Sequence, residues 1–389
     1  MNLYQIMIPT RIYFGRNIWR EAIKEQEAVL RGNIMIVTTG RSLWRLGYIE
    51  ELCRQLQNCR YTENVIIFDK ISANPRLSEV QEGILLGRQE RADVIVGFGG
   101  GSAIDAAKAI ATGIRSEVGI EDMFYQKIEP EKDTLPVIAI PTTAGTGSEL
   151  SKAAILTDGV QKIKSGIRGD ALYPTIAIVD SVFTESIPLQ VTMETGFDVL
   201  AHAVESYISK AASLYTKMQS ETAIRIVGEY LPRLAENPAD TEAREKMSFA
   251  SMIMGINLGN ASTCLPHRLQ YPIGANTDTS HGAGLAALYT AWISREYNYS
   301  FGQVERVLFL LTGKEVRGKA ASAEEIFRFI KSLGLKTSLR QLGIERKELQ
   351  AMADQVTGNI GNDPVSQEED IILKLYEEAW QEEAVCRQS

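Results

Sequence analysis

The sequence predicts an α/β N-terminal domain followed by an all-α C-terminal domain. Up to about residue 180, short apolar runs alternate with amphipathic stretches, which is typical of parallel strands joined by helices. After Ile187, long helical patterns dominate and no internal repeat is visible. The 389 residues exceed the size of one ordinary hydrophobic core. We therefore expect two domains, 1–184 and 185–389, with no low-complexity linker between them.

Each element of the first domain has its own signal. Apolar runs predict buried strands at 33–39, 64–69, 93–101, 136–143 and 175–180. Amphipathic stretches predict the helices between them at 42–57, 78–89 and 103–114. Such strands form a parallel sheet that is covered by helices on both faces. In the second domain, the clearest predicted helices span 191–211, 216–236 and 370–384.

Composition limits the classes of function. Hydrophobic residues make up 44% of the chain and charged residues 23%, which is ordinary for a globular protein. The net charge of −8 disfavours nucleic acid or an anionic membrane as a general partner. No apolar run approaches the roughly 20 residues needed to span a bilayer, and the N-terminus lacks the order of a signal peptide. The cysteines show no CxxC pairing and indicate free thiols in a reducing cytoplasm; they are Cys53, Cys59, Cys264 and Cys386.

Two glycine-rich loops follow predicted strands. "GFGGGSAIDAAK" places Gly99, Gly100 and Gly101 between a strand and a helix, and "PTTAGTGSE" (141–149) follows another strand. Glycine lets a backbone approach a ligand closely, and a helix N-terminus attracts phosphate. At the carboxyl ends of parallel strands, such loops form the crevice where nucleotides bind. One glycine-rich turn alone is also consistent with a tight turn that Ser102 caps.

The chain has only three histidines, and their placement is unusual. Asp198 and His202 are four residues apart on a predicted helix, so both side chains leave one face. His267 lies on a later segment, and His281 follows the polar loop "ANTDTS". One carboxylate and three imidazoles suit a borderline divalent ion such as Fe²⁺ or Zn²⁺. The spacing of Asp198 and His202 alone is more often that of a surface pair on a helix.

Taken together, these motifs resemble the iron-containing, or group III metal-dependent, alcohol dehydrogenases. "GGGSAIDAAK", "PTTAGTGSE", "FDVLAHAVESYIS" and the His267–His281 pair occur in the family's order and cover nearly the whole chain. The resemblance implies a Rossmann-like nucleotide-binding domain before a helical metal-binding domain, the dehydroquinate synthase-like architecture. It also implies an oxidoreductase that transfers hydride between NADPH or NADH and a small alcohol or aldehyde, and a homodimer or higher homo-oligomer.

The resemblance assigns roles to individual residues. Asp198, His202, His267 and His281 would hold one divalent metal, most often Fe²⁺, with Zn²⁺ as an alternative. The candidates for cofactor contacts are Thr39, Arg41, Asn74, Gly99, Gly100, Gly101, Ser102, Thr142, Thr143, Thr146 and Lys164. Each of these could instead be a turn or capping residue. The metal would act as a Lewis acid on the substrate oxygen, while the nicotinamide supplies the hydride chemistry.

The chain departs from the family pattern at two positions. Many members carry a second histidine four residues after the third ligand, where this chain has Tyr271. Its hydroxyl could relay a proton, or its ring could pack against substrate or core. Many NAD-preferring members carry an acid after the first strand, where this chain has Thr39, with Arg41 nearby. We therefore expect NADPH to be used at least as well as NADH.

Two arginines raise an alternative substrate class. Arg268 adjoins His267, and Arg168 lies in "KIKSGIRGD". An arginine in the pocket would bind a carboxylate or phosphonate on the substrate. Neighbouring helix positions point in different directions, so we expect Arg268 to face away or to meet a partner chain. A dehydroquinate synthase-like lyase is a further alternative, but the chain offers only scattered basic residues for that chemistry. The sequence leaves the substrate, the native metal and the oligomeric state open.

Overall fold

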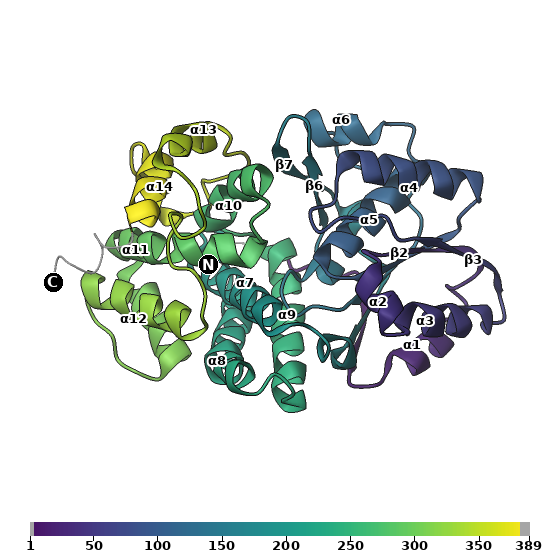
Figure 1. Cartoon of the computed structure of the whole chain (residues 1–389), viewed down its shortest axis with the longest axis horizontal. Helices are drawn as coiled ribbons and strands as arrows, with labels where there is room; N and C mark the ends of the chain where they lie inside the picture. The colour runs from purple at the N-terminus through teal and green to yellow at the C-terminus, as the bar shows by residue number, and fades with distance from the viewer. Residues whose placement is uncertain (1–3, 382–389) are drawn as a thin grey trace. The chain divides into compact units, whose positions relative to one another are not determined.

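The computed structural model describes residues 4–381. These residues form two compact units: Ile8–Ser186, and the chain from Ile187 onward together with the segment that ends at Met7. The first unit is α/β and the second is helical, which confirms the expected fold class (Figure 1). The C-terminal end of the helix expected over 370–384, and Cys386, lie outside the described residues. Among the described residues, no helix is long and apolar enough to cross a membrane.

The α/β unit is built on a six-stranded parallel sheet. Its strand order is β1-β8-β5-β4-β2-β3. The strands are β1 (Arg11–Gly15), β2 (Gly32–Val37), β3 (Thr62–Phe68), β4 (Val94–Gly99), β5 (Val137–Pro141) and β8 (Ile176–Asp180). The chain leaves β2 toward β3 on one side and returns to β4 on the other. Loops diverge at such a switch point, so it is the usual place for a nucleotide site.

Successive side chains of a strand point to opposite faces of the sheet, so each face has its own hydrophobic core. Ile34 and Ile36 on β2 belong to the core beside α1 (Trp19–Glu25) and α3 (Tyr48–Gln57). Met35 and Val37 belong to the core on the opposite face, where α4 (Leu77–Gln89), α5 (Gly101–Arg115) and α6 (Ile120–Tyr125) pack. Because both faces are covered, the inner strands β4, β5 and β8 are buried along their whole length.

The structure adds elements that the sequence pattern did not predict. Among them are the edge strand β1, the helices α1 and α6, and the strands β6 (Ala153–Asp158) and β7 (Ile163–Arg168), which form a separate antiparallel pair. The helix expected over 42–57 is two helices, α2 (Arg41–Arg45) and α3. It is interrupted at Gly47, whose φ of 72° is incompatible with a continuous helix.

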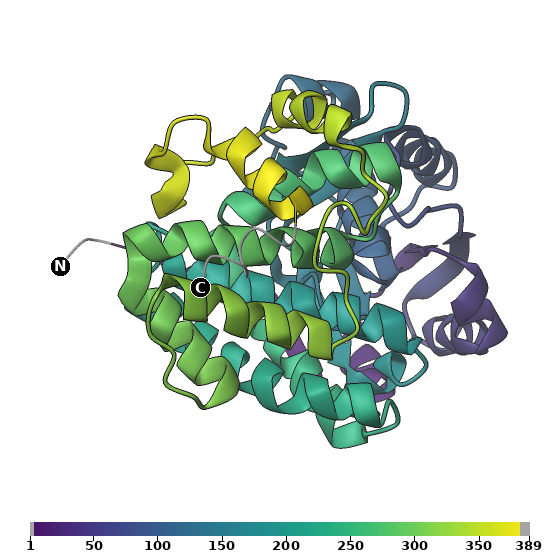
Figure 2. The same ribbon diagram turned by 60° about the vertical axis from the view of Figure 1, so that its left-hand side comes forward.

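The second unit is a bundle of packed helices, coloured teal to yellow in Figures 1 and 2. Its helices are α7 (Leu189–Ile208), α8 (Leu214–Glu236), α9 (Thr241–Asn260), α10 (Leu265–Thr277), α11 (His281–Thr312), α12 (Lys319–Ser332), α13 (Leu349–Asp354) and α14 (Ile371–Gln381). The helix α7 packs against α8, α9 and α11, and α10 packs against α11 and α13. This packing brings the predicted metal-ligating residues of three helices together.

Candidate active site

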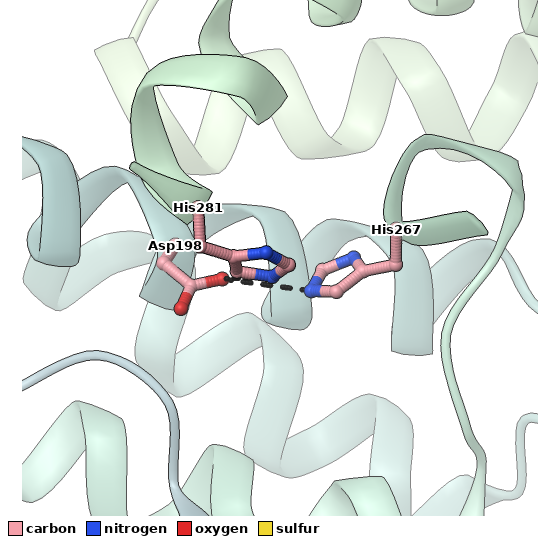
Figure 3. A group of neighbouring side chains, drawn as sticks. All are labelled: Asp198, His267 and His281. Carbon is pink, nitrogen blue, oxygen red and sulfur yellow. Dashed lines mark ion pairs between the residues drawn. The ribbon is translucent and has the colours of Figure 1, made fainter. Parts of the chain in front are cut away.

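One buried carboxylate oxygen is surrounded by all three histidines. Asp198 and His202 lie one turn apart on α7, His267 lies on α10, and His281 is the first residue of α11. Figure 3 shows Asp198, His267 and His281 pointing toward one another. Oδ1 of Asp198 lies 3.5, 3.6 and 3.7 Å from Nε2 of His267, His281 and His202, respectively. The histidines that are scattered in sequence therefore converge on one point.

The geometry fits a divalent ion held by nitrogen and oxygen ligands. Tetrahedral bonds of about 2.1 Å place ligand atoms about 3.4 Å apart, close to the separations here. The ligand atoms of Asp198, His267 and His281 all lie within 4.8 Å of one another. Oδ1 of Asp198 and Nε2 of His267 are buried and accept or donate no hydrogen bond within the described chain. Buried polar atoms are rarely left in this state, and a metal ion would satisfy them.

The charges of the site also favour a cation. Burial opposes a charge on His267, but the carboxylates of Glu205 and Asp198 outweigh burial and raise the pKa of this imidazole to about 10. Burial opposes a charge on Asp198 too, yet the imidazoles of His202 and His281 lower the pKa of this carboxyl well below its ordinary value. The site therefore holds a fixed negative charge and attracts positive charge.

Glu205 orients His267. Its side chain is fully buried on α7, and Oε1 lies 2.7 Å from Nδ1 of His267. Its other oxygen accepts a hydrogen bond of 2.8 Å from the backbone N–H of Cys264, just before α10 begins. A carboxylate at Nδ1 keeps a proton on that nitrogen, so a metal ion at the centre of the site would displace the proton of Nε2 and take its lone pair.

Gln270 has the same role toward His281. Its Oε1 is hydrogen-bonded to Nδ1 of His281, and the Gln270 side chain is buried on α10. The sequence analysis missed both Glu205 and Gln270. Their positions could have indicated a role beside the histidines. Glu205 follows His202 by three residues and Gln270 follows His267 by three, and such positions share a helix face.

Tyr271 and Arg268 lie beside this cluster. The ring of Tyr271 is stacked on the His281 imidazole with centroids 6.3 Å apart. Arg268 donates a hydrogen bond of 3.4 Å from Nη1 to the Tyr271 hydroxyl. Arg268 is only 5% exposed and lies within the helical unit beside Tyr271, whereas we expected it to face away from the site or to meet a partner chain. The reason is that α10 is buried on nearly all sides in this unit.

The glycine-rich loops meet at the carboxyl ends of β2, β4 and β5, within the α/β unit. A Cβ on Gly99 would lie 2.7 Å from Ala103 Cβ, and a Cβ on Gly101 would lie 2.5 Å from the Thr146 hydroxyl. A Cβ on Gly100 would lie 3.4 Å from the hydroxyl of Thr143. At Gly99 and Gly101 these contacts leave no room for a side chain, whereas a Cβ on Gly100 would make ordinary van der Waals contact. The backbone N–H groups at the start of α5 therefore stay accessible to a ligand such as a phosphate.

The remaining predicted cofactor residues border the same loops. Ser102 donates a hydrogen bond to the carbonyl of Ala73, and Asn74 accepts one of 2.9 Å from Nζ of Lys164. Thr142 continues β5, and its N–H donates to the carbonyl of Gly99 at 2.9 Å. The structure thus brings the two glycine-rich loops, the Asn74 turn and Lys164 together within one unit.

A buried ion pair on α5 contacts the second glycine-rich loop, 141–149. Lys108 is fully buried on α5, 3.1 Å from the carboxylate of Asp105, and it donates to the carbonyl of Ser148 at 2.9 Å. Asp105 accepts hydrogen bonds from the Ser148 hydroxyl and the Ile155 N–H. Burial lowers the pKa of Lys108. Both residues belong to the motif "GGGSAIDAAK", whose pattern alone did not predict a role for them.

Thr39 and Arg41 follow β2. The Thr39 hydroxyl would lie 3.7 Å from a Cβ on Gly99, so Thr39 borders the first glycine-rich loop. Arg41 is the exposed first residue of α2. A nearby acid that the sequence analysis did not consider is Asp69, after β3, but its carboxylate accepts a hydrogen bond of 3.1 Å from Nε1 of Trp44.

The second arginine considered as a substrate contact is Arg168. It ends β7 in the α/β unit and is exposed. Of the cysteines, Cys53, Cys59 and Cys264 are free thiols in the described chain, as expected.

Comparisons with known proteins identify the family of the chain. The model of the iron-containing alcohol dehydrogenase family matches residues 9–181, and the model of the C-terminal part of the Fe-containing alcohol dehydrogenase family matches residues 192–380. An NAD-dependent methanol dehydrogenase from Bacillus methanolicus is 31% identical over 358 residues, which cover 89% of this chain and 91% of that protein.

Solved structures resemble the whole chain. An NADH-dependent butanol dehydrogenase A from Thermotoga maritima has a TM-score of 0.88 and 26% identity, with 98% of this chain and 99% of that chain covered. A sulfoacetaldehyde reductase from Bifidobacterium kashiwanohense in complex with NAD+ has a TM-score of 0.86 and 28% identity over 100% of both chains. The chain therefore belongs to the iron-containing alcohol dehydrogenase family and is a metal- and NAD-dependent alcohol dehydrogenase of that family.

Proposed function

We propose that Asp198, His202, His267 and His281 hold one divalent ion, Fe²⁺ with Zn²⁺ as an alternative, and that small alcohols and aldehydes react beside it. One observation supports this most directly: three imidazole Nε2 atoms surround a single buried carboxylate oxygen. When bound, such an ion supplies Lewis acidity to a carbonyl or alkoxide oxygen, and the nicotinamide supplies or accepts the hydride.

The side chains of the chain provide orientation and charge for this chemistry. Glu205 and Gln270 fix the tautomers of His267 and His281, so both Nε2 atoms keep a lone pair for the ion. Tyr271 forms a wall beside His281. Its hydroxyl is a candidate to hold the proton that a substrate hydroxyl loses.

The nucleotide occupies the glycine-rich loops in this proposal. The N–H groups at the start of α5 bind the pyrophosphate together with Gly99, Gly100, Gly101 and Ser102. Thr142, Thr143 and Thr146 line the phosphates and the nicotinamide ribose, and Lys164 and Asn74 contact a ribose. Thr39 and Arg41 border the adenosine end, where Arg41 favours a 2′-phosphate.

Charge and cysteine content bear on the compartment and the partners of the enzyme. We propose that it works in the cytoplasm as a homodimer or higher homo-oligomer, with neither nucleic acid nor membrane as a partner. The net charge of −8 and three free cysteines in the described chain support a reducing compartment and a small-molecule substrate.

The test is nicotinamide oxidation by iron-loaded protein with a panel of short aldehydes. We expect NADPH to give a kcat/KM at least equal to that of NADH. Arg41→Ala should lower the value for NADPH more than that for NADH, because only NADPH carries the 2′-phosphate. A strong preference for NADH that Arg41→Ala leaves unchanged would contradict the assignment of Arg41.

The same assay separates the alternative reaction class. A dehydroquinate synthase-like lyase recycles its nicotinamide, so it would show no net oxidation with any aldehyde. Net turnover that disappears on chelation and returns with Fe²⁺ supports the dehydrogenase.

A further inference from the structure

Arg268 is a buried guanidinium without an anionic partner. Its side chain is 5% exposed, and within residues 4–381 it forms no ion pair. It has two long hydrogen bonds of 3.4 Å, to the hydroxyls of Tyr271 and Ser262, and its Nε has no hydrogen-bond partner. In the same unit, Arg306 is paired with Glu221 and Arg295 with Glu378.

The two buried acids that contact the start of α10 already accept hydrogen bonds from other groups. Glu205 accepts hydrogen bonds from His267 and from the N–H of Cys264. Asp363 accepts from the N–H of Leu265 and from Nε1 of Trp292, at 2.8 and 2.9 Å. A guanidinium stays charged under all physiological conditions, and a buried charge without a counter-charge is costly. A negatively charged ligand would remove this cost.

The position of Arg268 indicates which ligand that is. Its guanidinium carbon lies 5.8 Å from the centre of the Tyr271 ring, and this ring is stacked on His281. Nε2 of His281 in turn faces Oδ1 of Asp198 at 3.6 Å. One aromatic side chain therefore separates the unpaired positive charge from the group of residues to which we assign the metal. A molecule that reacts at the metal needs only a short chain to reach Arg268.

We propose that Arg268, with the hydroxyls of Ser262 and Tyr271, forms an anion subsite that selects the substrate. The substrate is a short aldehyde, or the matching alcohol, whose far end carries a carboxylate or a phosphonate. A planar guanidinium binds either group through two parallel hydrogen bonds. This inference rests on the proposed function, because it names the substrate class for the same site.

The test compares pairs of aldehydes that differ in the terminal anion. The pairs are succinic semialdehyde against butanal, and phosphonoacetaldehyde against propanal, each with iron-loaded enzyme and saturating NADPH. We expect kcat/KM to favour the anionic member of at least one pair, and the favoured pair distinguishes carboxylate from phosphonate. In Arg268→Met, the ratio of anionic to neutral kcat/KM should fall by roughly tenfold or more, as expected for a lost hydrogen bond to a charged group.

Two further variants serve as comparisons. Arg268→Lys keeps the charge without the planar fork, so its ratio should lie between those of wild type and Arg268→Met. Arg168→Met removes an exposed arginine of the other unit and should leave the ratio unchanged. Calorimetric titration of wild type and Arg268→Lys with succinate and phosphonoacetate, which are not reduced, measures anion binding without turnover and remains informative if Arg268→Met does not fold.

The outcomes separate the inference from the function on which it rests. The subsite is overturned if wild type prefers the neutral aldehyde in both pairs, or if the ratio falls in Arg168→Met instead. It is also overturned if Arg268→Met weakens NADPH binding and leaves the ratio unchanged, because Arg268 would then bind the cofactor. No turnover of any aldehyde by the iron-loaded wild type would instead contradict the proposed function, and the titrations would still test the subsite.

Discussion

At the scale of single residues, the site is defined by what lies behind the histidines as well as by the histidines. The three imidazoles of the chain face one oxygen of Asp198, and buried polar partners hold two of these rings. Removing a ligand and removing an orienting partner should therefore have different consequences.

Loss of a proposed ligand should remove activity. In His267→Ala, we expect no measurable aldehyde reduction and strongly weakened binding of Fe²⁺, because one lost ligand removes both affinity and geometry. Circular dichroism should show a retained fold. Metal content and turnover measure the effect, and Asn276→Ala on the same helix is the control. Near-wild-type turnover in metal-free His267→Ala protein would refute the metal assignment.

Loss of an orienting group should weaken the metal more than it harms the fold. In Glu205→Gln, the amide N–H₂ can donate to Nδ1 of His267, which would move the ring proton to Nε2 and block the lone pair. We expect metal affinity to fall by about 10- to 100-fold, the usual effect of such orienting groups. Titration of the metal-free protein with Fe²⁺ or Co²⁺ measures this change. If affinity is unchanged, Glu205 serves only to anchor the start of α10 through Cys264.

At the scale of elements, the sequence predicted the strands that have a local apolar pattern. The five apolar runs correspond to β2, β3, β4, β5 and β8, because buried parallel strands are apolar throughout. The pair β6–β7 was missed, since it lies outside the main sheet and is only partly buried. The edge strand β1 was missed because its residues are mostly half-buried.

The convergence of the three histidines on Asp198 was expected from motifs whose order the family shares. Glu205 and the unpaired state of Arg268 depend on tertiary contacts, which the sequence does not reveal. We expected Arg268 to face away from the site or to meet a partner chain, and its burial follows from the packing around α10.

The two glycine-rich loops touch where Gly101 meets Thr146. A Cβ at Gly101 would lie 2.5 Å from the Thr146 hydroxyl and 2.9 Å from its Cβ, so Gly101→Ala must push the two loops apart. We expect weaker nicotinamide binding and a raised KM for the cofactor. Fluorescence titration with NADPH provides the measurement.

Gly302→Ala on α11 is the matched control, because a Cβ there meets nothing within 4 Å. That change should preserve cofactor binding and stabilise the protein by about 0.5–1 kcal/mol. Unaltered NADPH affinity in Gly101→Ala would show that the loops do not bind the cofactor through this contact.

At the scale of the whole molecule, the helical unit contains a buried pair of acids that makes stability depend on pH. Glu296 and Asp363 both accept a hydrogen bond from the single N–H of Val365, at 3.2 and 3.0 Å. Burial and the negative charge of Asp363 raise the pKa of Glu296 to about 9. Burial raises the pKa of Asp363 as well. The folded protein therefore holds a proton here that the unfolded chain releases at its ordinary carboxyl pKa.

The sign of the pH dependence follows from this difference. Between the ordinary carboxyl pKa and about 9, the folded state binds more protons than the unfolded state. The free energy of unfolding must then fall as pH rises, by up to about 1.4 kcal/mol for each pH unit and proton. Glu221 has the opposite dependence, because its hydrogen bond to Arg306 lowers its pKa, so its contribution is lost as pH falls.

Glu296→Gln tests this account, because the amide keeps an acceptor for the Val365 N–H and cannot ionise. We expect the variant to be more stable than wild type at mildly alkaline pH, with the difference shrinking as pH falls toward the ordinary carboxyl pKa. Urea denaturation at acidic, neutral and alkaline pH measures it, with Glu221→Gln as the control that should not reproduce the gain. Equal pH slopes for wild type and Glu296→Gln would mean that Glu296 is ionised in the folded protein, with its charge stabilised by the N–H of Val365.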